Sequence, residues 1–326
     1  MKSHFLALML LAALGAVGAA EPDHPAALPA EPELQVVLVT GEQPGPALWK
    51  VSGNFHHTLW ILGDVSPLPK KAQWKSREFA KLLGHSQEVI LHLSSYWRGN
   101  DAQSSALENA GRFRDGHTLK DVLSPELYAQ VRSIWEIYGS REKLDDLRPF
   151  SVGNRIINGA MSRLDLKAHS VNTTVDRLAR KANVKITKFY TPPLEFDDHL
   201  KTVRADSVSA CLGRVVEILR DGGSGMRQLA NAWAIGDIDS LRTLVPAFAF
   251  YPNGSPSATC FAAIHGGPQA AEEYEAKQLA NWLKEAERAL LDNTSTLAVV
   301  PITELFAPDG YLAALRARGY EVVEPD

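Results

Sequence analysis

The chain has 326 residues, of which 34 are Lys or Arg and 38 are Asp or Glu, so its formal net charge is −4. This acidic balance argues against a nucleic acid or an anionic membrane surface as the main partner. A chain of this length can bury a full hydrophobic core, as one large domain or as two.

The first twenty residues have the pattern of a secretory signal peptide. Lys2 precedes a run of small apolar residues at 5–17, and Gly18–Ala20 supplies the small residues of a cleavage site. The apolar run is too short to span a bilayer comfortably, which favours a cleaved signal over an uncleaved anchor. We therefore expect cleavage near Ala20 and export to the periplasm or secretion. Charges interrupt every later apolar run, so we expect no stable membrane span in the mature chain.

After a leader rich in Pro and acidic residues at 21–33, β-prone segments come first, helical patterns fill the middle, and β-prone segments return at the end. The predicted strands are Gln35–Thr40, Leu48–Val51, Thr58–Leu62, Glu88–Leu93, Val184–Phe189, Leu297–Val300 and Glu321–Val323. The predicted helices are Ser76–Leu83, Pro125–Tyr138, a helix with its N-cap near Asn172, Phe196–Leu219, Met226–Trp233, Ala271–Leu291 and Asp309–Arg318.

This order of elements predicts an α/β fold. We expect a central mixed sheet built from N- and C-terminal strands, flanked by helices, with a helix-rich middle section. Residues 34–326 are predicted to form a single domain.

The two cysteines, Cys211 and Cys260, fit an exported protein. In an oxidising compartment such a pair forms either one disulfide or two buried thiols. We favour a disulfide that ties two elements of the C-terminal half together. Neither cysteine lies in a nucleophile motif.

Polar residues stand at or just after the ends of three predicted strands. Gly63-Asp64-Val65-Ser66 ends the second hairpin strand, His92 lies near the end of an apolar strand, and Glu304 follows the late strand. Functional groups are often placed where strands pass into loops. Further residues accompany these segments, namely Leu68-Pro69, Trp74, Asp309-Gly310 and Gly319-Tyr320.

Together these segments resemble the TraB/GumN family, which is related to the Tiki proteases and more loosely to the EreA/ChaN-like proteins. The resemblance runs from about Leu48 to Val323. In that family a Gly-x-x-His, a Glu and a second Gly-x-x-His stand in the three places, and the His–Glu–His set is thought to bind a divalent metal in the protease branch. Here the three places hold Ser66, His92 and Glu304. The resemblance therefore implies the family's fold with an altered metal-hydrolase site.

Three functions remain open at this point. In the first, the scaffold persists without a cofactor and binds a ligand or partner, because a serine hydroxyl is a poor ligand for first-row metals. In the second, the chain hydrolyses peptides or esters with Ser66 as nucleophile, His92 as base and Glu304 as the group that orients the imidazole. In the third, Asp64 replaces the lost ligand. An Asp64, His92 and Glu304 set would suit a divalent metal such as Mn, Fe or Zn.

Three residues are candidates for substrate binding. Asp64 points the same way as Ser66 in an extended segment. Arg98 is close in sequence to His92 and could bind an acidic group or an oxyanion, although a surface ion pair explains it as well. Glu195 could line the cleft or simply begin a helix.

Taken singly, each of the three central residues also has an ordinary structural interpretation. Asp64 and Ser66 could cap a turn, and His92 could be a hydrogen-bonded core residue. Their joint placement carries the functional interpretation. The sequence thus predicts an exported protein with a degenerate hydrolase site and a binding or accessory role toward an unknown peptide, ester or protein ligand.

Overall fold

The computed structural model describes residues 45–53, 56–93, 100–168, 170–191, 195–248, 260 and 262–325. The predicted signal peptide at 1–20, the leader at 21–33 and the strand at Gln35–Thr40 lie outside these ranges and stay predictions. Every element below belongs to the unit Gly41–Asp326. No helix among the described residues is long and apolar enough to cross a membrane.

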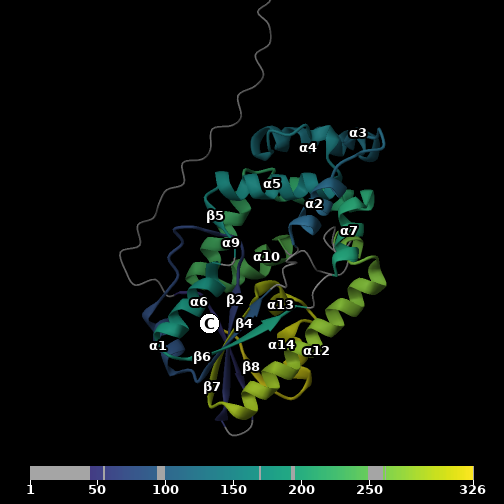
Figure 1. The fold of residues 1–326 in the computed structure, drawn as a ribbon. Helices are drawn as coiled ribbons and strands as arrows, with labels where there is room; N and C mark the ends of the chain where they lie inside the picture. Colours follow the sequence, from purple (N-terminus) through teal and green to yellow (C-terminus); the bar gives the residue numbers. More distant parts are fainter. Residues whose placement is uncertain are drawn as a thin grey trace, which may run out of the picture. The chain divides into compact units, whose positions relative to one another are not determined.

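Six strands form one mixed sheet in the order β6-β4-β7-β2-β1-β8 (Figure 1). Their bounds are Leu48–Ser52 for β1, Thr58–Asp64 for β2, Glu88–Leu93 for β4, Lys185–Tyr190 for β6, Ser295–Pro301 for β7 and Glu321–Val323 for β8. Strands β6, β4, β7 and β2 run parallel, whereas β1 pairs antiparallel with both β2 and β8. A separate antiparallel pair joins β3 (Leu68–Pro69) to β5 (Leu166–Lys167). The predicted α/β class and its mixed sheet are confirmed.

Alternate side chains of each central strand enter two hydrophobic cores on opposite faces of the sheet. On β4, Val89 and Leu91 enter one core and Ile90 enters the other, so the strand reads as a continuous apolar run. We call these the α6 face and the α12 face. The helices of the α6 face are α1 (Arg77–His85), α6 (Ser170–Lys181), α9 (Ser224–Ile235) and α10 (Ile238–Phe248). Those of the α12 face are α12 (Pro268–Asp292) and α14 (Tyr311–Ala317), and the short α13 (Ile302–Phe306) contributes to both cores.

The helix-rich middle section builds a third core of its own. Its helices are α3 (Leu119–Val122), α4 (Pro125–Tyr138), α5 (Pro149–Arg163) and α8 (Ser209–Leu219), with α2 (Asp101–Ala110) and α7 (Phe196–Arg204) beside them. The bounds of α4 match the prediction because its start is encoded locally. The Ser124 hydroxyl accepts a hydrogen bond from the Leu127 amide, and Pro125 occupies the first turn.

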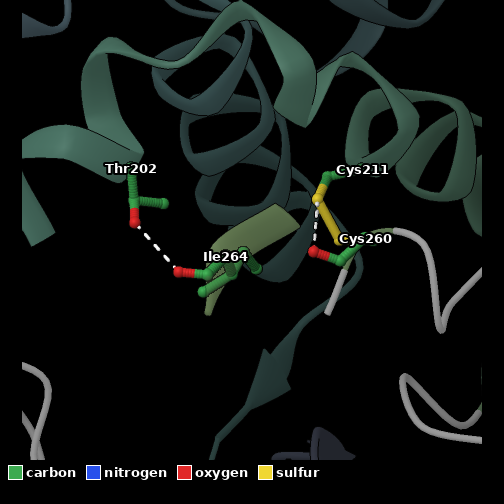
Figure 2. Close-up of a disulfide and its surroundings, with 4 residues drawn as sticks. All are labelled: Thr202, Cys211, Cys260 and Ile264. Atoms are coloured by element: carbon green, nitrogen blue, oxygen red, sulfur yellow. Dashed lines mark hydrogen bonds between the residues drawn. A yellow bond between two sulfur atoms is a disulfide. The ribbon is translucent and has the colours of Figure 1, made fainter. Parts of the chain in front are cut away.

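Cys211 of α8 and Cys260 form a disulfide, with their Cα atoms 4.7 Å apart (Figure 2). The predicted pairing is confirmed. Close by, the Thr202 hydroxyl of α7 donates a 3.0 Å hydrogen bond to the Ile264 carbonyl. Two independent contacts therefore fasten the segment that leads into α12 to the helices of the middle section.

Two local predictions were wrong. The predicted helix Phe196–Leu219 is two helices, because the chain leaves α7 at Ala205 and makes a 3-10 turn at Asp206–Val208. Arg148 stabilises this break, since its guanidinium donates to the Arg204 carbonyl and to the Asp206 carboxylate.

Asn172 does not cap a helix. It lies inside α6 and is almost completely buried, and its amide donates to a carboxylate on β2. A polar residue on the buried side of a helix marks a tertiary contact here, where the sequence suggested a helix end.

Candidate functional site

The carboxyl ends of the parallel strands lie along one edge of the sheet, where α/β proteins commonly bind ligands. Asp64 ends β2, His92 is the next-to-last residue of β4, and Glu304 stands on α13 directly after β7. The topology thus brings the three predicted segments to neighbouring strands, since β7 lies between β2 and β4.

The register of the strands nevertheless sends two of these side chains to opposite faces. Leu62 of β2 and Leu91 of β4 both pair with Val299 of β7, and all three enter the core of the α6 face. Asp64 follows Leu62 by two residues and therefore points to the α6 face, whereas His92 follows Leu91 by one and points to the α12 face. Contacts on each side agree with this assignment.

His92 is buried among aromatic rings of the α12 face, with an exposed fraction of 4%. Its imidazole stacks on Phe189 at 4.9 Å between ring centroids, and the edge-to-face contact with Tyr311 is 6.1 Å. Neither imidazole nitrogen has a hydrogen-bond partner among the residues that the structure describes. Burial lowers the pKa of His92 to about 4, so the imidazole is neutral near pH 7.

Glu304 also lies on the α12 face, but unlike His92 it has a hydrogen-bond partner there. Its carboxylate accepts a 3.2 Å hydrogen bond from the Gln278 amide of α12, and the same amide donates to the Tyr311 hydroxyl at 3.2 Å. Burial, and next the charge of Glu275, raise the pKa of Glu304 to about 7. His92 and Glu304 therefore share Tyr311 as a neighbour without contacting each other through a hydrogen bond.

Asp64 faces α6. One of its carboxylate oxygens accepts a 2.8 Å hydrogen bond from the Asn172 amide, while the other has no partner within the described ranges. Burial raises the pKa of Asp64 to about 7, against the smaller opposite effect of the Asn172 hydrogen bond. Ser66 lies two residues further on, before a cis Ser66–Pro67 bond, and its side chain is exposed.

The hydrogen bonds of a Ser66, His92 and Glu304 triad are not formed, because both imidazole nitrogens lack a partner in the described structure. The metal alternative meets a similar obstacle. Within the described residues, no three or more His, Cys, Asp or Glu side chains form a group that could hold a metal ion. Asp64, His92 and Glu304 are divided between two faces of the sheet, so this donor set does not fit a divalent metal.

Of the two other candidate residues for substrate binding, the structure describes Glu195 but not Arg98. Glu195 is exposed at the start of α7, where it precedes the first helical residue without a capping hydrogen bond from its side chain. Arg98 lies outside the described residues, and its role in substrate binding stays a prediction.

Sequence reasoning missed several residues that surround the candidate site. Gln278 lies one turn before Trp282 on the apolar stripe of α12, and a polar residue on such a stripe was the available signal. Tyr311 follows the Asp309-Gly310 pair and stacks on Trp282 at 4.9 Å. Burial raises the pKa of Tyr311 far above its usual range, so its hydroxyl stays protonated.

A family model described as the TraB/PrgY/gumN family matches residues 47–324. The chain belongs to the TraB/PrgY/gumN family. This match spans the whole described sheet, from β1 to β8, and agrees with the resemblance seen in the sequence between about Leu48 and Val323. No curated protein and no solved structure matches the chain.

Proposed function

We propose that this TraB/PrgY/gumN family member is an exported binding or accessory protein whose ancestral metal-hydrolase site has been altered. The observation that carries the proposal is the surroundings of His92. Its imidazole is buried between Phe189 and Tyr311, and its nitrogens contact no nucleophile and no orienting carboxylate in the described structure.

The chemistry of the three positions supports a loss of hydrolysis. A general base must reach the proton that it removes, either directly or through one water. No direct hydrogen bond joins the exposed Ser66 to the buried imidazole of His92. A serine hydroxyl needs a base to become a strong nucleophile at neutral pH, and His92 does not serve Ser66 in that role here.

One observation favours a residual hydrolase as the second candidate. The pKa of Glu304 is raised to about 7, and a carboxyl group with that pKa can both give and take a proton near neutral pH. In this alternative, Glu304 would act as a general acid or base on a peptide or ester bound beside Gln278 and Tyr311.

Export is supported by two features. The basic residue, apolar run and small residues at 1–20 have the pattern of a cleaved signal. The Cys211–Cys260 disulfide is the kind of bond that persists in an oxidising compartment. The periplasm or the extracellular space is therefore the proposed location, and a peptide, ester or protein the proposed ligand.

A turnover and metal screen tests the proposal. The mature wild-type protein, a Ser66→Ala, His92→Ala double variant and a Glu304→Gln variant are assayed on the same peptide and ester substrates, with and without added Mn²⁺ or Zn²⁺. We expect equal background turnover by all three proteins and no stoichiometric metal in the wild type. Turnover that only the double variant loses would support the triad. Turnover that only Glu304→Gln loses would support the second candidate. Stoichiometric metal that disappears in an Asp64→Ala variant would support the re-ligated site.

A further inference from the structure

A cavity of about 170 Å³ lies beside α13, separate from the residues of the candidate site. Its walls include Trp49 of β1, Leu305 and Phe306 of α13, and Leu312 of α14. Neither His92 nor any other residue of the candidate site described above lines it. We call it the arginine cavity, because Arg242 of α10 and Arg316 of α14 stand on its rim.

Most of the residues that line the arginine cavity are apolar, and three of them are firmly packed. The exposed fractions of Trp49, Leu305 and Leu312 are 2%, 6% and 3%. Trp49 and Phe306 contact each other edge to face, with 5.7 Å between their ring centroids. An enclosed apolar cavity of roughly 150 Å³ binds benzene. The arginine cavity has a similar volume but is partly open and is also lined by Arg242, Arg316 and Glu324, so it can accept a ring-sized apolar group that is only partly buried.

The rim carries two guanidinium groups on a single carboxylate. The two carboxylate oxygens of Glu324 accept hydrogen bonds from different arginines, one from Arg242 and one from Arg316, the latter at 2.9 Å. The Arg242 guanidinium also lies 5.9 Å from the centroid of the Phe306 ring. The cavity lining therefore has an excess of positive charge next to apolar side chains, and Glu324 already shows how a carboxylate fits between the two arginines.

We propose that the arginine cavity binds a small organic carboxylate with one ring-sized apolar group, and that its carboxylate replaces that of Glu324 between Arg242 and Arg316. Planar guanidinium groups match the geometry of a carboxylate. The ion pairs of Glu324 are partly exposed, with 37% of its side chain accessible, so breaking them costs little. The apolar group then gains partial burial against the more accessible lining residues Phe306, Pro308 and Ala313.

Titration calorimetry of the mature protein with benzoate tests this proposal. Glu324→Gln removes the competing carboxylate and should tighten benzoate binding by about threefold. An Arg242→Gln, Arg316→Gln double variant removes the charged donors and should weaken it by at least about tenfold. Glu321→Gln is the matched control, because Glu321 is an exposed acid on β8 that does not line the cavity.

Two further probes separate the charge from the ring. Acetate carries the charge without the ring, benzamide carries the ring without the charge, and both should bind more weakly than benzoate. The proposal is overturned if benzamide binds as well as benzoate, or if Glu324→Gln and Glu321→Gln have equal effects. Unchanged benzoate binding in the double arginine variant, or no benzoate binding to any variant at millimolar concentrations, would overturn it too. Urea unfolding midpoints confirm that each variant remains folded.

Discussion

Replacing Asp64 with asparagine should stabilise the protein at alkaline pH. One Asp64 oxygen accepts the Asn172 amide at 2.8 Å, whereas the other Asp64 oxygen and the Asn172 side-chain oxygen lack partners in the described structure. In Asp64→Asn the carbonyl keeps the existing hydrogen bond, and the new amide can donate to the Asn172 oxygen. The variant also removes a buried negative charge, which is the costly feature of the wild-type site.

The magnitude follows from the pKa of Asp64, which burial raises from 3.8 to about 7. Between these two values the folded protein binds a proton that the unfolded chain has released, so the free energy of unfolding falls as pH rises through this window. Each pKa unit corresponds to about 1.4 kcal/mol, which makes the loss about 4 kcal/mol when the window has been crossed. The asparagine side chain of Asp64→Asn does not titrate, so the free energy of unfolding of the variant lacks this decrease. The stability difference between variant and wild type should therefore grow by about 4 kcal/mol from pH ~4 to pH ~8.

Urea unfolding under non-reducing conditions measures this difference at a series of pH values. Taking the difference between the two proteins cancels the titration of groups that both share. Asp197→Asn is the matched control for the loss of one carboxylate, because Asp197 is exposed in the first turn of α7. A stability difference for Asp64→Asn that does not change with pH, or that changes no more than the control, would refute the reasoning, and so would a variant less stable than wild type at pH ~8.

Three other predictions concern the α12 face and the disulfide. Because burial raises the pKa of Glu304 from 4.5 to about 7, Glu304→Gln should gain about 3 kcal/mol over wild type between pH ~4 and pH ~8 in the same urea assay. The pH dependence expected for His92 has the opposite sign. Because burial lowers its pKa, the folded state loses stability as pH falls below about 6.5. The advantage of His92→Leu over wild type should therefore grow by about 2 kcal/mol by pH ~5, and a pH-independent difference would contradict the burial argument. A thiol assay of the denatured, unreduced protein should detect no free thiol, and two reactive thiols would show that the Cys211–Cys260 bond is absent. Replacing both cysteines with serine should lower the free energy of unfolding by about 4 kcal/mol, given their separation of 49 residues.

The sequence predicted those elements whose limits are set by neighbouring residues. Helix α4 begins at Pro125 because Ser124 caps it, and the last strand is found at Glu321–Val323 as expected. The break between α7 and α8 was missed because Arg148, which stabilises it, lies more than fifty positions earlier in the chain. A helix end that depends on such a contact leaves no local pattern.

The position of the three site residues was predicted, but the directions of their side chains were not. Within one strand the alternation of faces can be read from the sequence, as for Leu91 and His92. Which face of β4 corresponds to which face of β2 depends on how both strands pair with β7, and this register arises from packing across the whole sheet. Hence the separation of Asp64 from His92 becomes visible only in the folded structure.

The most direct test of the proposed loss of hydrolysis is chemical labelling of Ser66. A fluorophosphonate reacts with a serine that a neighbouring base activates, and intact-mass measurement counts the adducts. We predict no adduct on Ser66 that depends on His92, because neither imidazole nitrogen of His92 has a hydrogen-bond partner among the described residues. An adduct at Ser66 that disappears in His92→Ala would contradict the account and establish a working serine hydrolase.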